Sequence, residues 1–270
     1  MKGDGQIVRG RFADVCRVFL GAYLFLARMT RHELLFALIS LARRTTSWGV
    51  EEDQRLQHFV GFVKGSTSTG LYLNVVFDDV ITLHIHVDSD HAVCPFSRRS
   101  TSGAAEVIRG PKGTNVLIDG TTKPQVIAEI SSGGAETIAV EQEFVADAID
   151  LETVRVIQAE YPSLRLGSFF LRRTCIPTLV FLEDIDMKIE ECVLHIDATV
   201  AISALKGSYH GILFYLNKTH GVNLSALGDL IRKLGIRIVK EPSLTNDADM
   251  YTKGLNGREI REKCSRLGIM

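Results

Sequence analysis

Apolar residues recur at helical spacing through the first 65 residues and then change to a mixed pattern. Helices are expected over about residues 15–27, 34–41 and 56–65, because apolar positions there repeat every three to four residues. The first of these segments is apolar nearly all round, which predicts a buried helix. The third ends at Gly65, and the polar residues 66–70 after it indicate a break between two parts of the chain.

The pattern after residue 70 is that of an α/β domain. Short apolar runs predict strands at residues 71–76, 81–88, 104–108, 115–118, 192–196 and 236–239. Helical spacing predicts helices at residues 135–160, 200–205, 224–234 and 247–267. Strands that come first and then alternate with helices indicate a mixed sheet with helices packed against it.

Composition narrows the functional class without fixing it. The 270 residues are 46% hydrophobic and 23% charged with a net charge of -1, so the chain can bury a core and is not a strongly cationic nucleic-acid binder. The most apolar run, residues 18–27, is shorter than the roughly 20 residues of a membrane span, and no signal peptide is evident. Five cysteines, none close to another, fit a reducing compartment. We therefore expect an intracellular protein, in the cytoplasm or the nucleus, without a membrane partner.

Isolated carboxylates stand near the ends of predicted strands and the starts of predicted helices. Asp88 and Asp197 end strands, Glu136 lies in a first helical turn, and Asp249 begins the C-terminal helical region. Strand ends of an α/β sheet are where ligands collect, and four oxygen ligands there would suit Mg²⁺. The alternative is that each carboxylate is a helix cap or a solvated loop residue, and spacing alone leaves this open.

A second pattern on the same strand suggests different metal chemistry. His84, His86, Asp88 and Asp90 alternate, so one strand face could present all four side chains. Imidazole suits zinc and iron, which makes a transition-metal site one interpretation. We favour the other, in which the histidines fill a half-buried face and Asp88 works with the distant carboxylates.

Four blocks of sequence, in a fixed order, carry the strongest signal in the chain. VDSDHA at residues 87–92 is followed by RRSTSG at 98–103. SSGGAE occupies residues 131–136, LHID occupies 194–197, and NDADMYTKGL occupies 246–255. Together these blocks resemble the ribonuclease H domain of copia-type LTR retrotransposon Pol polyproteins. The corresponding family segments read Asp-Ala-Asp-Trp-Ala-Gly, Arg-Lys-Ser-Thr-Ser-Gly, Ser-Ser-x-Glu-Ala-Glu, a strand ending in Asp, and Asn-x-Ala-Asp-x-x-Thr-Lys-x-Leu.

The resemblance also covers the helical lead-in and implies a domain organisation. Residues 21–31, 41–43 and 62–66 are similar to the end of the family's reverse transcriptase region. Residues 1–77 would then be a helical remnant of the reverse transcriptase. Residues 78–270 would form a ribonuclease H-like domain of the α/β class, with a mixed five-stranded sheet and flanking helices.

The activity implied by the resemblance is cleavage of the RNA strand of an RNA–DNA hybrid. The cofactor would be two Mg²⁺ ions, with Mn²⁺ as a possible substitute, and the other partner would be the remainder of a Pol polyprotein. The catalytic and metal-ligating residues would be Asp88, Glu136, Asp197 and Asp249. Candidate contacts with the nucleic acid are Arg98, Arg99, Gln125, Ser131, Ser132 and His220.

Three departures from the family pattern keep a second interpretation open. The first Glu of the family's Glu-Ala-Glu is Gly134, one family Trp is His91, and another is Gly120. The two Trp replacements are expected to weaken core packing. The alternative is therefore a folded, catalytically inactive remnant that acts at most as an interaction module.

Overall fold

The computed structural model describes residues 8–92, 98–129, 131–144, 189–207, 211, 213, 215–233 and 235–270. The chain divides into two compact units. The first comprises Met1–Leu71 with Ile269–Met270, and the second comprises Tyr72–Gly268. The predicted strand at residues 71–76 is wrong, because Leu71 and Asn74 make only isolated bridges. No helix in the described part of the chain is long and apolar enough to cross a membrane.

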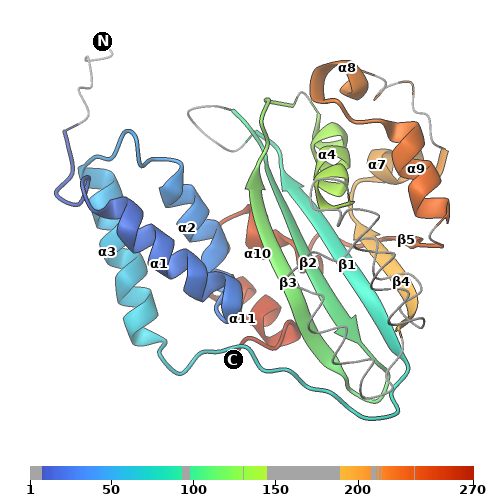
Figure 1. Ribbon diagram of the computed structural model, residues 1–270, viewed down its shortest axis with the longest axis horizontal. Helices are drawn as coiled ribbons and strands as arrows, with labels where there is room; N and C mark the ends of the chain where they lie inside the picture. Colours follow the sequence, from blue (N-terminus) through green and yellow to red (C-terminus); the bar gives the residue numbers. More distant parts are fainter. Residues whose placement is uncertain are drawn as a thin grey trace, which may run out of the picture. The chain divides into compact units, whose positions relative to one another are not determined.

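The first unit is helical, as predicted (Figure 1). It contains α1 (Cys16–Met29), the 3-10 helix η1 (His32–Leu34), α2 (Leu35–Ala42) and α3 (Val50–Gly65). The expectation that the first helix is buried all round is wrong, because Val18 and Phe25 on α1 are 76% and 72% exposed. An apolar sequence favours burial, but a helix face is buried only where a partner covers it.

A five-stranded mixed sheet forms the centre of the second unit (Figure 1). Its strands are β1 (Ile81–Asp90), β2 (Thr101–Arg109), β3 (Asn115–Pro124), β4 (Ile189–Ile196) and β5 (Arg237–Lys240). The spatial order is β3-β2-β1-β4-β5. The first three strands are antiparallel neighbours, whereas β4 runs parallel to β1 and β5 runs parallel to β4. This topology confirms the predicted ribonuclease H-like fold class.

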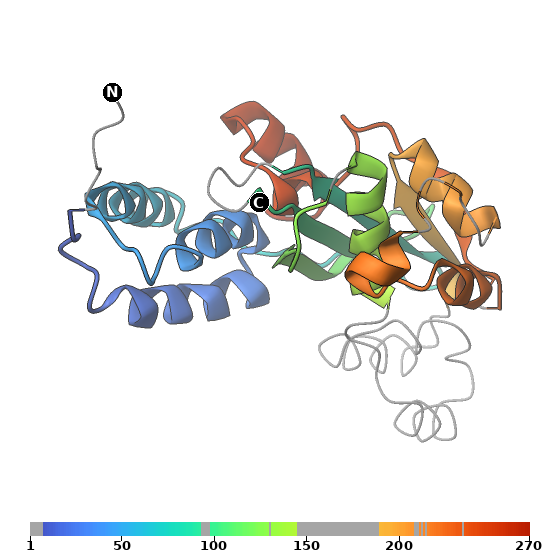
Figure 2. The ribbon, with the colours of Figure 1, turned by 90° about the horizontal axis from the view of Figure 1, so that it is seen from above.

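Helices of the second unit lie between and after the last strands of the sheet. They are α4 (Ser132–Phe144), α7 (Thr199–Gly207), α8 (Leu216–His220), α9 (Leu224–Lys233), α10 (Asp249–Thr252) and α11 (Gly257–Arg266). Figures 1 and 2 both show α7, α8 and α9, drawn in gold to orange, gathered at the end of the sheet where β4 and β5 lie. The predicted helix over residues 135–160 is described only as far as Phe144, and residues 163–188 lie outside the described residues.

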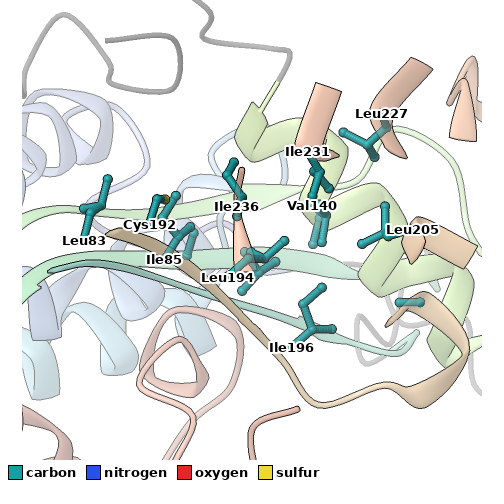
Figure 3. Packing of buried hydrophobic residues seen from close by; sticks show 14 of the residues in the cluster. Leu83, Ile85, Val140, Cys192, Leu194, Ile196, Leu205, Leu227, Ile231 and Ile236 are labelled. Carbon is teal, nitrogen blue, oxygen red and sulfur yellow. The ribbon is translucent and has the colours of Figure 1, made fainter. Parts of the chain in front are cut away.

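Alternation along β1 decides which side chains form the core. Leu83 and Ile85, with their odd-numbered neighbours, are buried against helices α4, α7 and α9 (Figure 3). Leu194 of β4 joins the same cluster together with Val140 of α4. Because side chains alternate across a strand, the even-numbered residues of β1 face the other side of the sheet. That face carries His84, His86, Asp88 and Asp90.

Candidate active site

The four predicted carboxylates come from four separate elements that meet near one edge of the sheet. β1 and β4 are parallel neighbours, and His86 pairs with His195. Asp88 and Asp197 lie two residues after this pair, so the parallel register brings the two carboxylates to the same end of the strands. Asp197 directly follows β4, as predicted, whereas Asp88 does not end its strand, because β1 continues to Asp90. Glu136 lies in α4, and Asp249 is the first residue of α10.

Glu136 and Asp197 form the closest part of this group. Burial of Glu136, which is 5% exposed, raises its pKa to about 10, and contact with the Asp197 carboxylate adds to the rise. The backbone N–H of Ala198 donates to Oε2 of Glu136 at 2.9 Å, which opposes the rise. Without a cation, Glu136 therefore holds a proton at neutral pH.

Asp88 is linked electrostatically to the other carboxylates. Burial raises the pKa of Asp88 to about 6. The Lys253 ammonium and the Thr252 hydroxyl act in the opposite direction, while the charges of Asp249 and Asp197 raise the pKa further. The Thr252 hydroxyl donates to Oδ2 of Asp88, which fixes this carboxylate against α10.

Two lysines contact the Asp249 side of the site. The ammonium of Lys253 lies 2.7 Å from Oδ1 of Asp249 and 3.9 Å from Oδ2 of Asp88. Lys263 is buried, and its ammonium lies 3.1 Å from Oδ2 of Asp249. Positive charge is therefore already placed where four carboxylates would otherwise repel one another.

The donor set fits a hard divalent cation. Oδ1 of Asp197 is buried and has no hydrogen-bond partner among the described residues, whereas Oδ2 accepts a hydrogen bond from Oγ of Ser243 at 2.7 Å. Mg²⁺ prefers carboxylate oxygens and water, and an unpartnered buried carboxylate oxygen is a group that such an ion would satisfy. Asp88, Glu136, Asp197 and Asp249 are the residues that could hold it.

The predicted nucleic-acid contacts do not form one surface. Arg98, Arg99 and Ser132 are exposed. Gln125 is instead buried, at 1% exposure. Its amide nitrogen donates at 3.0 Å to Oγ of Ser102 and at 2.8 Å to the carbonyl of Ala135. Gln125 therefore ties β2 to α4 from inside the protein and does not present its amide to a ligand.

Ser131 and His220 belong to a side-chain cluster centred on a carboxylate that sequence reasoning missed. Glu129 is buried, accepts a hydrogen bond from the Tyr215 hydroxyl, and lies 3.4 Å from Nε2 of His220. Oγ of Ser131 lies 3.4 Å from the same hydroxyl. Glu129 also explains how Gly134 is accommodated, because a Cβ added at Gly134 would meet the Glu129 carboxyl carbon at 2.7 Å.

A neighbouring side chain also explains how Gly120 is accommodated in place of the family's Trp. The expectation that this replacement weakens core packing is wrong. A Cβ at Gly120 would meet Cζ of Tyr251 at 2.5 Å, and Tyr251 is fully buried. The Tyr251 ring therefore fills the space beside Gly120, and this packing seats α10 against the sheet. His91 is exposed, and its Nε2 lies 3.2 Å from the carbonyl oxygen of Glu129.

Sequence patterns offered unequal signals for the missed residues. Thr252 and Lys253 belong to the last sequence block, close to Asp249, so the sequence already indicated that they lie near the site. Glu129 and Lys263 lie in no block, and only the folded chain brings them to Tyr215 and Asp249.

Comparisons with known proteins give one relative by sequence and several by structure. No family model matches the chain. The uncharacterized mitochondrial protein AtMg00240 of Arabidopsis thaliana is 30% identical over 80 residues, which are 30% of this chain and 70% of that protein. LC11-RNase H1, isolated from compost by a metagenomic approach, matches with a TM-score of 0.33 and 15% identity, covering 67% of this chain and 96% of its own. RNase H1 from Halobacterium salinarum NRC-1 matches with a TM-score of 0.29 and 13% identity, covering 62% of this chain and 90% of its own.

Proposed function

The chain belongs to the family of the uncharacterized mitochondrial protein AtMg00240 of Arabidopsis thaliana, and because that name assigns no activity, we propose a function from the site itself. The function is that of a ribonuclease H-type endonuclease, which hydrolyses the RNA strand of RNA–DNA hybrids with two divalent ions, Mg²⁺ or Mn²⁺. One observation supports the proposal: the parallel pairing of β1 with β4 brings Asp88 and Asp197 to the same end of the two strands. The backbone N–H of Ala198 holds Glu136 next to Asp197, and Lys253 contacts both Asp88 and Asp249.

Metal ions bound to these carboxylates would supply a nucleophilic water and stabilise the attacking and leaving oxygens of an in-line displacement. The protein side chains set the conditions for that chemistry. Burial keeps Glu136 protonated in the metal-free protein, so a cation bound beside it would displace this proton to solvent and gain the carboxylate as a ligand. Thr252 and Ser243 hold Asp88 and Asp197 through their hydroxyls and limit the rotation of both carboxylates.

Lys253 is placed to respond to the same change in charge. Its side chain is 41% exposed, so its ammonium can leave Asp249 and Asp88 without crossing the core. Beside a phosphodiester backbone, an ammonium at this position would neutralise phosphate charge. Arg98, Arg99 and Ser132 are exposed and can contribute to backbone contacts in the proposed complex.

The proposed function also includes the helical unit at the start of the chain. We assign residues 1–77 to the C-terminal region of a copia-type reverse transcriptase and residues 78–270 to its ribonuclease H-like domain. The exposed apolar residues Val18 and Phe25 on α1 support a unit that packs against another part of a Pol polyprotein.

A second candidate function has one observation in its favour. Lys253 and Lys263 together neutralise Asp249, so the site is partly charge-balanced without a metal ion. A folded remnant without activity, acting at most as an interaction module, would keep this arrangement.

Cleavage of a labelled RNA–DNA hybrid by the full chain tests the proposal. We expect cleavage of the RNA strand with Mg²⁺ or Mn²⁺, none in EDTA, and none of a DNA duplex. Asp88→Asn should abolish cleavage, while Asp229→Asn, which makes the same charge change at an exposed site on α9, should not. Absence of cleavage by the folded wild-type protein with either metal would support the inactive remnant instead.

A further inference from the structure

Three histidines gather on the face of the sheet opposite the hydrophobic core. His84 and His86 come from β1, and His195 comes from β4 beside them. One ring nitrogen from each lies within 4.8 Å of the other two. The rings of His86 and His195 are stacked with centroids 4.3 Å apart. The sequence grouped His84 and His86 with Asp88 and Asp90 of the same strand. In the structure their partner is instead His195 of β4.

Hydrogen bonds connect Glu241, His195 and His84 in a chain across the cluster. Nδ1 of His195 lies 2.9 Å from Oε2 of Glu241, so donation to this carboxylate leaves Nε2 as an acceptor. Nε2 of His195 in turn accepts a hydrogen bond from Nδ1 of His84 at 2.9 Å, and a bound ion would take the place of that hydrogen. A carboxylate that orients a ligating imidazole in this way is the usual second layer of a metal site.

The environment of His86 also supports a bound ligand at this cluster. Its side chain is 3% exposed, and its Nδ1 is buried with no hydrogen-bond partner among the described residues. Nε2 of His86 lies 3.5 Å from Nη1 of Arg109, which can only donate, and 3.8 Å from Oδ2 of Asp247. A buried polar nitrogen left unpaired is costly, and a bound cation would remove that cost.

We propose that His84, His86 and His195 form a binding site for one borderline divalent transition-metal ion, of which Zn²⁺ is the representative, with water as the fourth ligand. Three imidazoles and one water are a known tetrahedral zinc donor set. With Zn–N bonds of about 2.0–2.1 Å, ligand nitrogens on a tetrahedral ion are about 3.3 Å apart. The histidine nitrogens lie within 4.8 Å of one another, and the stacked rings of His86 and His195 would have to rotate out of parallel to direct both nitrogens at one ion.

The surrounding charges permit a cation there. Arg109 and Arg266 both pair with Asp247, at 2.8 and 2.7 Å, and Arg237 pairs with Glu191. Asp247 and Glu191 thus offset two of the three arginine charges, and the Glu241 carboxylate beside His195 offsets the third. Burial lowers the pKa of all three histidines, to about 4 for His84, which keeps the rings in the neutral form that binds metal.

The site is chemically distinct from the carboxylates at the end of β1. Its ligands are imidazoles, which suit zinc, copper, nickel or iron, whereas carboxylates suit Mg²⁺ and Mn²⁺. The ion would join β1 to β4, the two strands that also carry Asp88 and Asp197. Zinc binding by the three histidines does not depend on the proposed nuclease activity.

Equilibrium dialysis of the full chain against Zn²⁺ in excess Mg²⁺ tests the site, because Mg²⁺ competes for the carboxylates. We expect one bound zinc per wild-type chain and a melting temperature that rises with free Zn²⁺. His84→Asn and His195→Asn should lose the bound ion, whereas His58→Ala, at an exposed position on α3, should keep it. Co²⁺ should give the visible absorption of a tetrahedral site in the wild-type protein and in His58→Ala, and not in His84→Asn or His195→Asn.

Glu241→Gln keeps the three ligands and weakens their orientation, so its zinc affinity should fall by about 10–100-fold. This variant decides the matter if either histidine variant fails to fold. Absence of bound zinc in the wild-type protein, or unchanged zinc content in folded His84→Asn and His195→Asn, would overturn the proposal.

Discussion

The backbone N–H of Ala198 donates to Oε2 of Glu136 at 2.9 Å, and this hydrogen bond links the end of β4 to α4. It holds the Glu136 carboxyl beside Asp197, the residue that precedes the donor in the chain. The same contact accounts for much of the site's behaviour, because two carboxyl groups are kept close in a buried setting where only one of them readily ionises.

Asp197→Asn should remove activity and preserve the fold. The amide is a poor substitute for a negatively charged Mg²⁺ ligand, and losing one electrostatic contact of this kind commonly costs about 10²–10³ in rate. Oδ1 of Asp197 has no hydrogen-bond partner among the described residues, so the metal-free variant should melt no lower than wild type. Hybrid cleavage and thermal melting on the same two proteins check this, and full activity in the variant would exclude Asp197 from the site.

Glu136→Gln should change the dependence of stability on pH. The pKa of Glu136 is raised from 4.5 to about 10, so between those values the folded state holds a proton that the unfolded chain has released. The free energy of unfolding therefore falls as pH rises through this range. Glutamine carries no titrating proton and so removes that loss. We expect the free energy of unfolding of Glu136→Gln to exceed that of wild type by about 0.5–2 kcal/mol at neutral pH, and by little near pH 4.5.

Urea unfolding in EDTA across this pH range measures the difference. The gain from Glu136→Gln should grow with pH. A gain that stays constant with pH would show that Glu136 does not carry the proton.

Lys263→Met should destabilise the protein, because the buried ammonium contacts Oδ2 of Asp249 and the backbone carbonyl of Asn246. Removing one partner of a buried ion pair costs about 3–5 kcal/mol. Mg²⁺ should restore part of the lost stability if Asp249 is a metal ligand, because the ion binds only the folded state. Lys218→Met, at an exposed position on α8, is the control and should melt like wild type with or without Mg²⁺.

Gly120→Ala should weaken the packing of α10 against the sheet and destabilise the protein. The added Cβ would lie 2.5 Å from Cζ of Tyr251, and overpacking a core by one methyl group costs about 1–3 kcal/mol. Gly207→Ala is the matched control, because a Cβ there meets nothing within 4 Å. Denaturant unfolding of both variants checks the prediction, and equal stabilities would mean that the Tyr251 ring moves aside freely.

Local sequence patterns determined much of the fold. Alternation along residues 81–88 predicted β1, and helical spacing predicted α3 up to Gly65, because both signals depend only on residues two to four positions apart. The ends of two such strands also pointed to Asp88 and Asp197. Their meeting at one edge follows from the parallel pairing of β1 with β4.

Tertiary structure alone decided how distant segments meet. His84 and His195 are 111 positions apart, and their contact depends on the register between β1 and β4, which no local period encodes. The inward orientation of Gln125 and the position of Glu129 beside Gly134 likewise depend on contacts that no local period encodes. Whether a polar side chain faces solvent, a buried carbonyl or a metal ion depends on which neighbours the folded chain supplies. Those neighbours are fixed by packing across the whole sheet.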